Sequence, residues 1–181
     1  MISELNIAGM SCNLVLSSSQ YKTYPIEKPK VEDDELPDAA RWKVKDLLDC
    51  DLEEAITDTY EFPEDALRGR LAQLNVVASR RSVIAEAVEF VKQSGLVLES
   101  IDVVDLAIRN VAQRLADDEA RSVAVLYLRD GAGMMVLVKG GTLYFSRHFD
   151  FSLHALNEPS QQDGVIQQLA LEIQRSFDYF Q

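Results

Sequence analysis

The sequence has few of the residues on which redox chemistry and metal binding depend. Its 181 residues include two cysteines and two histidines. Cys12 and Cys50 lie far apart without the spacing of metal ligands, which predicts two reduced structural thiols of a cytosolic protein. His148 and His154 have no cluster of Cys, His or carboxylate residues that would complete four ligands, so we expect no metal site.

Long apolar runs and basic clusters are also missing. No apolar run approaches the ~18 residues that a membrane-spanning helix needs, and the N-terminus lacks a basic region followed by an apolar core, so we expect no signal peptide. Acidic residues outnumber basic ones, 30 to 18, for a formal net charge of −12. Because affinity for nucleic acid comes mainly from Lys and Arg, we set nucleic-acid binding aside. Membrane contact would then require a partner protein.

The last third of the sequence has the clearest secondary-structure pattern. Apolar runs between Val123 and Asp150 are separated by two glycine-rich turns, Asp130–Gly133 and Lys139–Gly141. Such turns are typical of hairpins, so we predict a three-stranded meander. A long helix follows, whose apolar residues share one face: Val165, Ile166, Leu169, Ile173, Phe177 and Phe180.

An earlier helix is predicted from an acidic segment. Asp33 or Asp34 is the expected N-cap, and Pro37 falls in the first turn, where its missing N–H costs little. We expect this helix to continue to about Leu48, with Trp42 packed at its margin. The apolar residues expected to form its buried stripe are Leu36, Ala40, Val44, Leu47 and Leu48.

The remaining elements define two units. Pro25 and Pro29 are expected to end the strand 21–27, because proline interrupts strand pairing. The expected strands are 13–16, 21–27, 55–62, 71–79 and 96–103, and the expected helices are 80–94 and 104–115. From 21 to 103 the order is β-α-β-β-α-β, which predicts helices on one side of an antiparallel sheet. We therefore predict an extra subdomain with N-terminal strands at 1–103, and a partial lobe of helix, meander and helix at 104–181.

Three segments resemble proteins of the PilM type, in the same order along the chain. Glu35–Leu48 begins at an acidic-Leu-Pro step and carries the pair Arg41-Trp42. The run from Val76 through Val103 is similar to the family's strand, helix and strand. Glu172–Phe180 is similar to its closing Glu-Ile-x-Arg-Ser helix.

The resemblance implies an α/β (α+β) chain, a fragment of the actin-like (ribonuclease H-like) ATPase fold with an inserted β-α-β-β-α-β subdomain. It implies a cytoplasmic scaffold at the inner-membrane platform of a type IV pilus of the MSHA (mannose-sensitive haemagglutinin) type. The implied partner is the cytoplasmic tail of a PilN-like inner-membrane protein, held in a groove that the extra subdomain lines. A second copy of the chain is a further candidate partner.

The family's phosphate-binding hairpin is degraded in this sequence. Nucleotide-binding relatives carry about Asp-Ile-Gly-x-x-x-Thr, and an ungapped alignment puts Tyr127 at the Asp, Arg129 at the Gly and Gly133 at the Thr. Tyr cannot replace a carboxylate that acts through Mg²⁺, and Arg adds bulk where backbone must approach phosphate. A register shifted to Asp130-Gly131 restores an Asp-Gly pair, although that pair is also a favoured tight turn.

Other parts of a nucleotide site are also not found. No Asp-Ile-Gly strand precedes Leu14, and the sequence ends before the segment that holds adenosine in the family, so we expect a fragment of a longer protein. We therefore predict no cofactor and no cofactor-binding residue. The alternative is an ATP-binding actin-like protein whose Mg·ATP site is completed by segments outside this sequence.

No catalytic residue is expected either. Ser146, His148 and Asp150 alternate along one strand, but Cα atoms about 6–7 Å apart do not readily give the contacts of about 2.6–3.2 Å that a triad needs. We interpret them as the polar, solvated face of an antiparallel strand. The carboxylate runs Glu53-Glu54 and Asp117-Asp118-Glu119 are interpreted as solvated.

Overall fold

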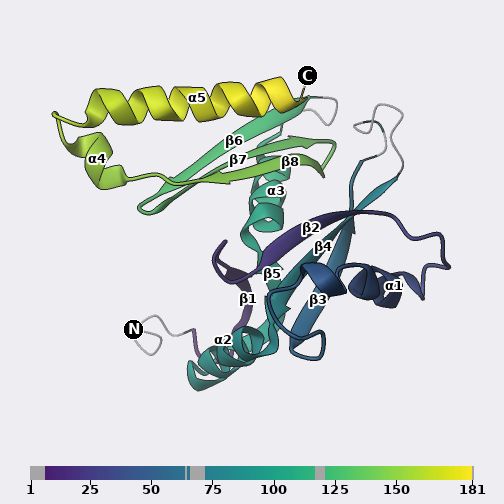
Figure 1. Cartoon of the computed structure of the whole chain (residues 1–181). Coiled ribbons are helices and arrows are strands. Elements are labelled where there is room, and N and C mark those ends of the chain that lie inside the picture. Colours follow the sequence, from purple (N-terminus) through teal and green to yellow (C-terminus); the bar gives the residue numbers. More distant parts are fainter. Residues whose placement is uncertain (1–6, 64, 66–71, 117–120, 181) are drawn as a thin grey trace. The chain divides into compact units, whose positions relative to one another are not determined.

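The computed structural model describes residues 7–63, 65, 72–116 and 121–180. The chain divides into two compact units, 1–104 and 105–181, and each is described by itself (Figure 1). No helix in the described ranges is long and apolar enough to cross a membrane.

The first unit contains two small sheets (Figure 1). Three strands form an antiparallel sheet in the order β2-β4-β3, and β1 pairs with β5 in parallel. The strands are β1 (Ser11–Leu16), β2 (Lys22–Glu27), β3 (Ala55–Glu61), β4 (Gln73–Arg80) and β5 (Val97–Val103). The helices are α1 (Leu36–Lys43), the 3₁₀ turn η1 (Lys45–Leu47) and α2 (Arg81–Gln93).

The predicted element order is present, but one predicted pairing is wrong. β5 does not join the antiparallel sheet and pairs with β1 instead. Apolar periodicity identifies a strand without identifying its partner. Pro25 lies inside β2 rather than at its end. Because β2 is an edge strand, the proline nitrogen does not interrupt pairing on a second side.

The helix α1 packs on one face of the antiparallel sheet. Its buried Ala40, together with Val44 at its C-cap, packs against Leu74 and Val76 of the central strand β4. Partly buried side chains complete this core: Tyr24, Ile26, Leu36 and Leu48.

Parts of the α1 prediction are wrong. The N-cap is Glu35 rather than Asp33 or Asp34, and it makes no side-chain capping bond. The α-helix ends at Lys43 and is followed by η1, a tighter 3₁₀ turn. This change turns Leu47 outward. Trp42 is 64% exposed and therefore not packed, with Lys45 Nζ 5.5 Å from its ring centre.

The second unit contains the predicted meander, with β7 central in the order β6-β7-β8. Met134 to Val138 of β7 are all buried, so this strand is covered on both faces. Figure 1 shows α3 and α5 on opposite sides of this sheet. The elements are α3 (Val104–Leu115), β6 (Ser122–Arg129), β7 (Ala132–Lys139), β8 (Thr142–Phe149), α4 (Leu153–Asn157) and α5 (Gln162–Phe180). The short helix α4 was not predicted.

The buried face of α5 is partly polar, unlike the predicted apolar stripe. Ile173 packs against Met135, Leu137 and Phe145 of the sheet. Glu172 and Ser176 are buried on the same helix, whereas Ile166 and Phe177 are substantially exposed. The side chain of Phe180 lies outside the described part of the structure.

Candidate functional site

The strand β8 sends alternate polar side chains to two different helices. Ser146 Oγ donates a hydrogen bond to Asp105 Oδ1, at the start of α3. Nε2 of His148 lies 2.9 Å from the same oxygen, within hydrogen-bonding distance. Asp105 is 5% exposed. These bonds tie the first turn of α3 to one face of β8.

This cluster corrects the interpretation of Ser146, His148 and Asp150. The face is polar, as predicted, but Asp105 covers part of it, so it is not simply solvated. A hydrolytic triad needs the serine hydroxyl bonded to the imidazole, and here the hydroxyl is bonded to the carboxylate. The arrangement serves packing. Asp150 lies elsewhere, in the wall of a cavity.

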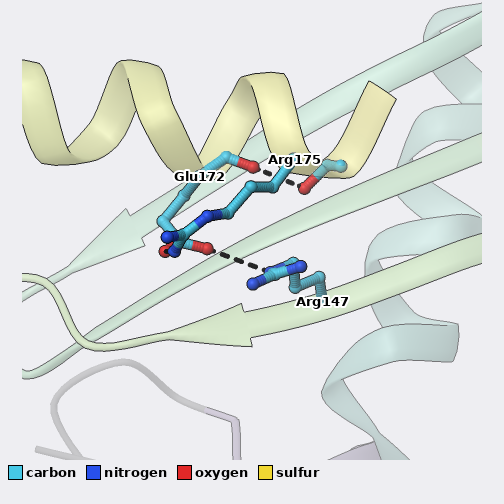
Figure 2. A network of polar contacts seen from close by, with 4 residues as sticks. Arg147, Glu172 and Arg175 are labelled. Carbon is cyan, nitrogen blue, oxygen red and sulfur yellow. Dashed lines mark hydrogen bonds and ion pairs between the residues drawn. The ribbon is translucent and has the colours of Figure 1, made fainter. Parts of the chain in front are cut away.

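On the other face of β8, Arg147 points to α5. Figure 2 shows the Glu172 carboxylate beside the guanidinium groups of Arg147 and Arg175. Arg147 Nε lies 3.0 Å from Glu172 Oε2, and Arg175 Nη1 lies 2.8 Å from Oε1. Ser176 Oγ donates to the backbone oxygen of Glu172 at 2.7 Å. The Glu172–Arg147 ion pair thus joins α5 to β8, while Arg175 and Ser176 bond to Glu172 within α5.

Residues at the tip of the β6–β7 hairpin contact Phe149 at the end of β8 and Leu153 at the start of α4. A Cβ atom placed on Gly133 would lie 2.1 Å from Phe149 Cε2, so the phenyl ring covers the position aligned with the family threonine. Asp130 Oδ1 accepts a hydrogen bond from Leu153 N, 3.1 Å away, at the start of α4. Gly131 has φ +81°, a turn conformation that glycine favours. In the structure, the Asp130-Gly131 pair therefore acts as a turn and a helix cap.

A cavity of about 450 Å³ opens beside this hairpin, at the end of the sheet where α4 and α5 meet. Its wall is mostly apolar, with one charged side chain, that of Asp150. The lining residues are Gly131, Phe149, Asp150, Phe151, Ser152, Ala155, Val165, Gln168 and Leu169. Sequence reasoning did not find this cavity, because its wall comes from four separate elements.

The antiparallel sheet of the first unit offers a second surface, on the side opposite α1. Register places two rows of three residues across it, Pro25–Asn75–Tyr60 and Thr23–Val77–Asp58. We call these six residues the second face. Thr23, Pro25 and Asp58 are exposed, Val77 and Tyr60 are half-buried, and Asn75 is buried. A face with apolar and hydrogen-bonding groups suits an extended peptide.

Two titratable groups lie on or near the α1 side of that sheet. A hydrogen bond from Lys22, with Nζ 3.2 Å from Asp49 Oδ2, holds the pKa of Asp49 below its ordinary value. Burial raises the pKa of the Tyr24 hydroxyl. Lys22 and Tyr24 alternate with Thr23 along β2, so their side chains lie on the opposite face of the sheet and do not contact the second face.

The other residues weighed from the sequence do not come together. Cys12 and Cys50 are half-buried free thiols. In the described ranges no group of three or more His, Cys, Asp or Glu residues could hold a metal ion. Glu53 and Glu54 are exposed in the turn before β3. The run Asp117–Glu119 lies outside the described residues.

Comparison with known proteins adds information at the level of fold. No protein-family model matches the sequence, and no curated protein matches it significantly. A solved chain of the PilM–PilN type IV pilus biogenesis complex matches 99% of this chain with a TM-score of 0.78 and 22% identity. The chain has a PilM-like fold. It covers 61% of that solved chain, and the match confirms the predicted mixed α/β, actin-like fold class.

Two more distant structures are also similar. The cytoplasmic domain of EpsL, an inner membrane component of the Vibrio cholerae type II secretion system, gives a TM-score of 0.49 at 17% identity, over 77% of this chain and 50% of that chain. A protein of unknown function with an actin-like ATPase fold, from Bacteroides thetaiotaomicron, gives 0.43 at 12% identity, over 90% and 53%.

Proposed function

We propose that this chain is a cytoplasmic scaffold of a type IV pilus, peripheral to the inner membrane, that acts by binding partner proteins. The observation that carries the proposal is the PilM-like fold over 99% of the chain, found in a complex of PilM with PilN. The finer assignment is to the MSHA type of pilus, in the role of the biogenesis protein MshI. It rests on the sequence resemblance at Glu35–Leu48, Val76–Val103 and Glu172–Phe180.

The proposed partner is the cytoplasmic tail of a PilN-like inner-membrane protein. The second face is the docking surface in this proposal, because its two aligned rows combine a half-buried valine and tyrosine with exposed polar groups. An extended tail would place alternate side chains along such rows. In this scheme 1–103 is the partner-binding subdomain, and 104–181 is the partial actin-like lobe.

A pull-down with matched variants tests the proposal. The protein is immobilised and mixed with the detergent-solubilised PilN-like partner. Val77→Arg places a charge in the middle of the second face and is expected to abolish retention. Ala85→Arg adds the same charge at an exposed position of α2 and is expected to retain the partner. Failure of the wild-type protein to retain the partner would contradict the proposal.

ATP binding is the alternative function, and the hairpin geometry bears on it. Phe149 covers Gly133, and Asp130 is engaged with Leu153, so we expect no heat when Mg·ATP is titrated into the protein. Tyr127→Asp restores the carboxylate of the ungapped register and is the gain-of-binding control. Micromolar binding by the wild-type protein would make the nucleotide-binding alternative the better account.

A further inference from the structure

We propose that the cavity between the β6–β7 hairpin, α4 and α5 binds an arginine side chain of a partner polypeptide. The site is separate from the second face and does not depend on the pilus assignment. Its volume of about 450 Å³ lies in the range of pockets that take small ligands, about 300–1,000 Å³. It can hold an arginine side chain together with part of an apolar neighbour.

The polar groups of the wall select a cation. Asp150 is exposed at the cavity, and no described cation or hydrogen-bond donor pairs with its carboxylate. Gln168 adds an uncharged amide, which can both accept and donate, so the charge preference rests on Asp150. Asp130, next to the lining Gly131 in sequence, brings a second carboxylate close to the hairpin tip. Arg129 is not among the lining residues. An anionic group such as phosphate would be repelled here.

The apolar part of the wall favours arginine over a compact cation. Phe149 and Phe151 line the cavity, and the half-buried Phe149 is the more accessible of the two rings. A guanidinium can stack on an aromatic face while it donates to a carboxylate. Val165 and Leu169 line the same cavity from α5 and can cover the methylene stem of arginine. Lysine has a more strongly hydrated charge, which is costlier to bring against these rings.

Two peptides that differ only in charge test the inference by NMR titration of the whole chain. Acetyl-Leu-Arg-amide is compared with acetyl-Leu-citrulline-amide, in which a neutral urea replaces the guanidinium. The arginine peptide is expected to bind at least about threefold more tightly. The largest amide shifts are expected at Ala155 and Gln168. Free methylguanidinium is expected to bind more weakly than the peptide, because it lacks the stem.

Two variants locate the charge preference. Asp150→Asn is expected to bring the ratio of the two dissociation constants to about 1. Asp163→Asn, which removes an exposed carboxylate from the first turn of the same α5, is expected to leave the ratio unchanged. Neither residue has a described partner, so both variants are expected to keep the dispersed spectrum of the folded protein.

Four results would overturn the inference. They are equal affinity for the two peptides, shifts that map away from the cavity, a preference that survives Asp150→Asn, and no shift with either peptide at about 10 mM.

Discussion

Replacing Glu172 with glutamine is expected to destabilise the second unit by about 1–2 kcal/mol. Glu172 is 9% exposed and carries ion pairs to Arg147 and Arg175. Glutamine has nearly the same size and keeps one acceptor oxygen, so the substitution removes charge without opening a cavity. The loss therefore measures the electrostatic contribution of the Glu172 carboxylate, from its ion pair with Arg147 of β8 and its ion pair with Arg175 within α5.

The magnitude follows from the exposure of the two arginines. Removing one partner of a fully buried ion pair costs about 3–5 kcal/mol, because the other charge is left without compensation. Here the side chains of Arg147 and Arg175 are 36% and 52% exposed, so water can solvate both guanidinium groups after the change. Solvent screening reduces the value of such pairs, which brings the expected cost down to about 1–2 kcal/mol.

Native-state hydrogen exchange is the assay, because it reports each unit separately. Amides of β7, β8 and α5 are expected to lose protection in Glu172→Gln, while those of β4 are unchanged. Glu86→Gln, at an exposed position of α2, is the matched control and should change neither set. A double-mutant cycle with Arg147→Gln should give a coupling of about 0.5–1 kcal/mol. Equal protection in Glu172→Gln and Glu86→Gln would refute the reasoning.

Other contacts give smaller, separate predictions. Gly133→Ala should cost about 1–3 kcal/mol in thermal denaturation, because Phe149 must move, and restored stability in the double variant with Phe149→Leu checks the cause. Asp105→Ala should cost about 1–2 kcal/mol in urea unfolding, since the half-buried Ser146 and the exposed His148 lose the buried carboxylate that they share; an unchanged midpoint would contradict this. The pKa of Asp49 is lower in the folded protein than its ordinary value of about 3.9. The contact with Lys22 therefore stabilises the folded state fully at a pH above that value, and this stabilisation is lost as the pH falls through the folded-state pKa. An NMR titration in which Lys22→Met leaves the Asp49 pKa unchanged would exclude Lys22 as the cause.

Local features of the fold could be predicted because they depend on nearby residues. Gly131, Gly140 and Gly141 adopt positive φ angles in the two turns, and the three strands that these turns separate form the predicted meander. Helix α3 has the predicted bounds, Val104–Leu115. These elements follow from glycine conformation and from apolar spacing, which act within a few residues.

Long-range features could not be predicted in the same way. The parallel pairing of β1 with β5 joins strands about eighty residues apart, and nothing in either strand specifies the other. Asp105 resembles an ordinary acidic residue in the first turn of a helix, so its bonds to Ser146 and His148 have no sequence signal. Trp42 is exposed because it lies two positions after the buried Ala40 within α1, about 200° around the helix and so on the opposite side.

Binding of the partner tail is the most direct test of the central claim. A synthetic peptide with the cytoplasmic tail of the PilN-like protein from the same organism would be titrated into the protein in a calorimeter, with a scrambled peptide as control. The account predicts saturable one-to-one binding of the tail, no binding of the scrambled peptide, and loss of binding in Val77→Arg but not in Ala85→Arg. Absence of heat with the native tail, in a protein shown to be folded, would contradict the assignment of this chain as a partner-binding pilus scaffold.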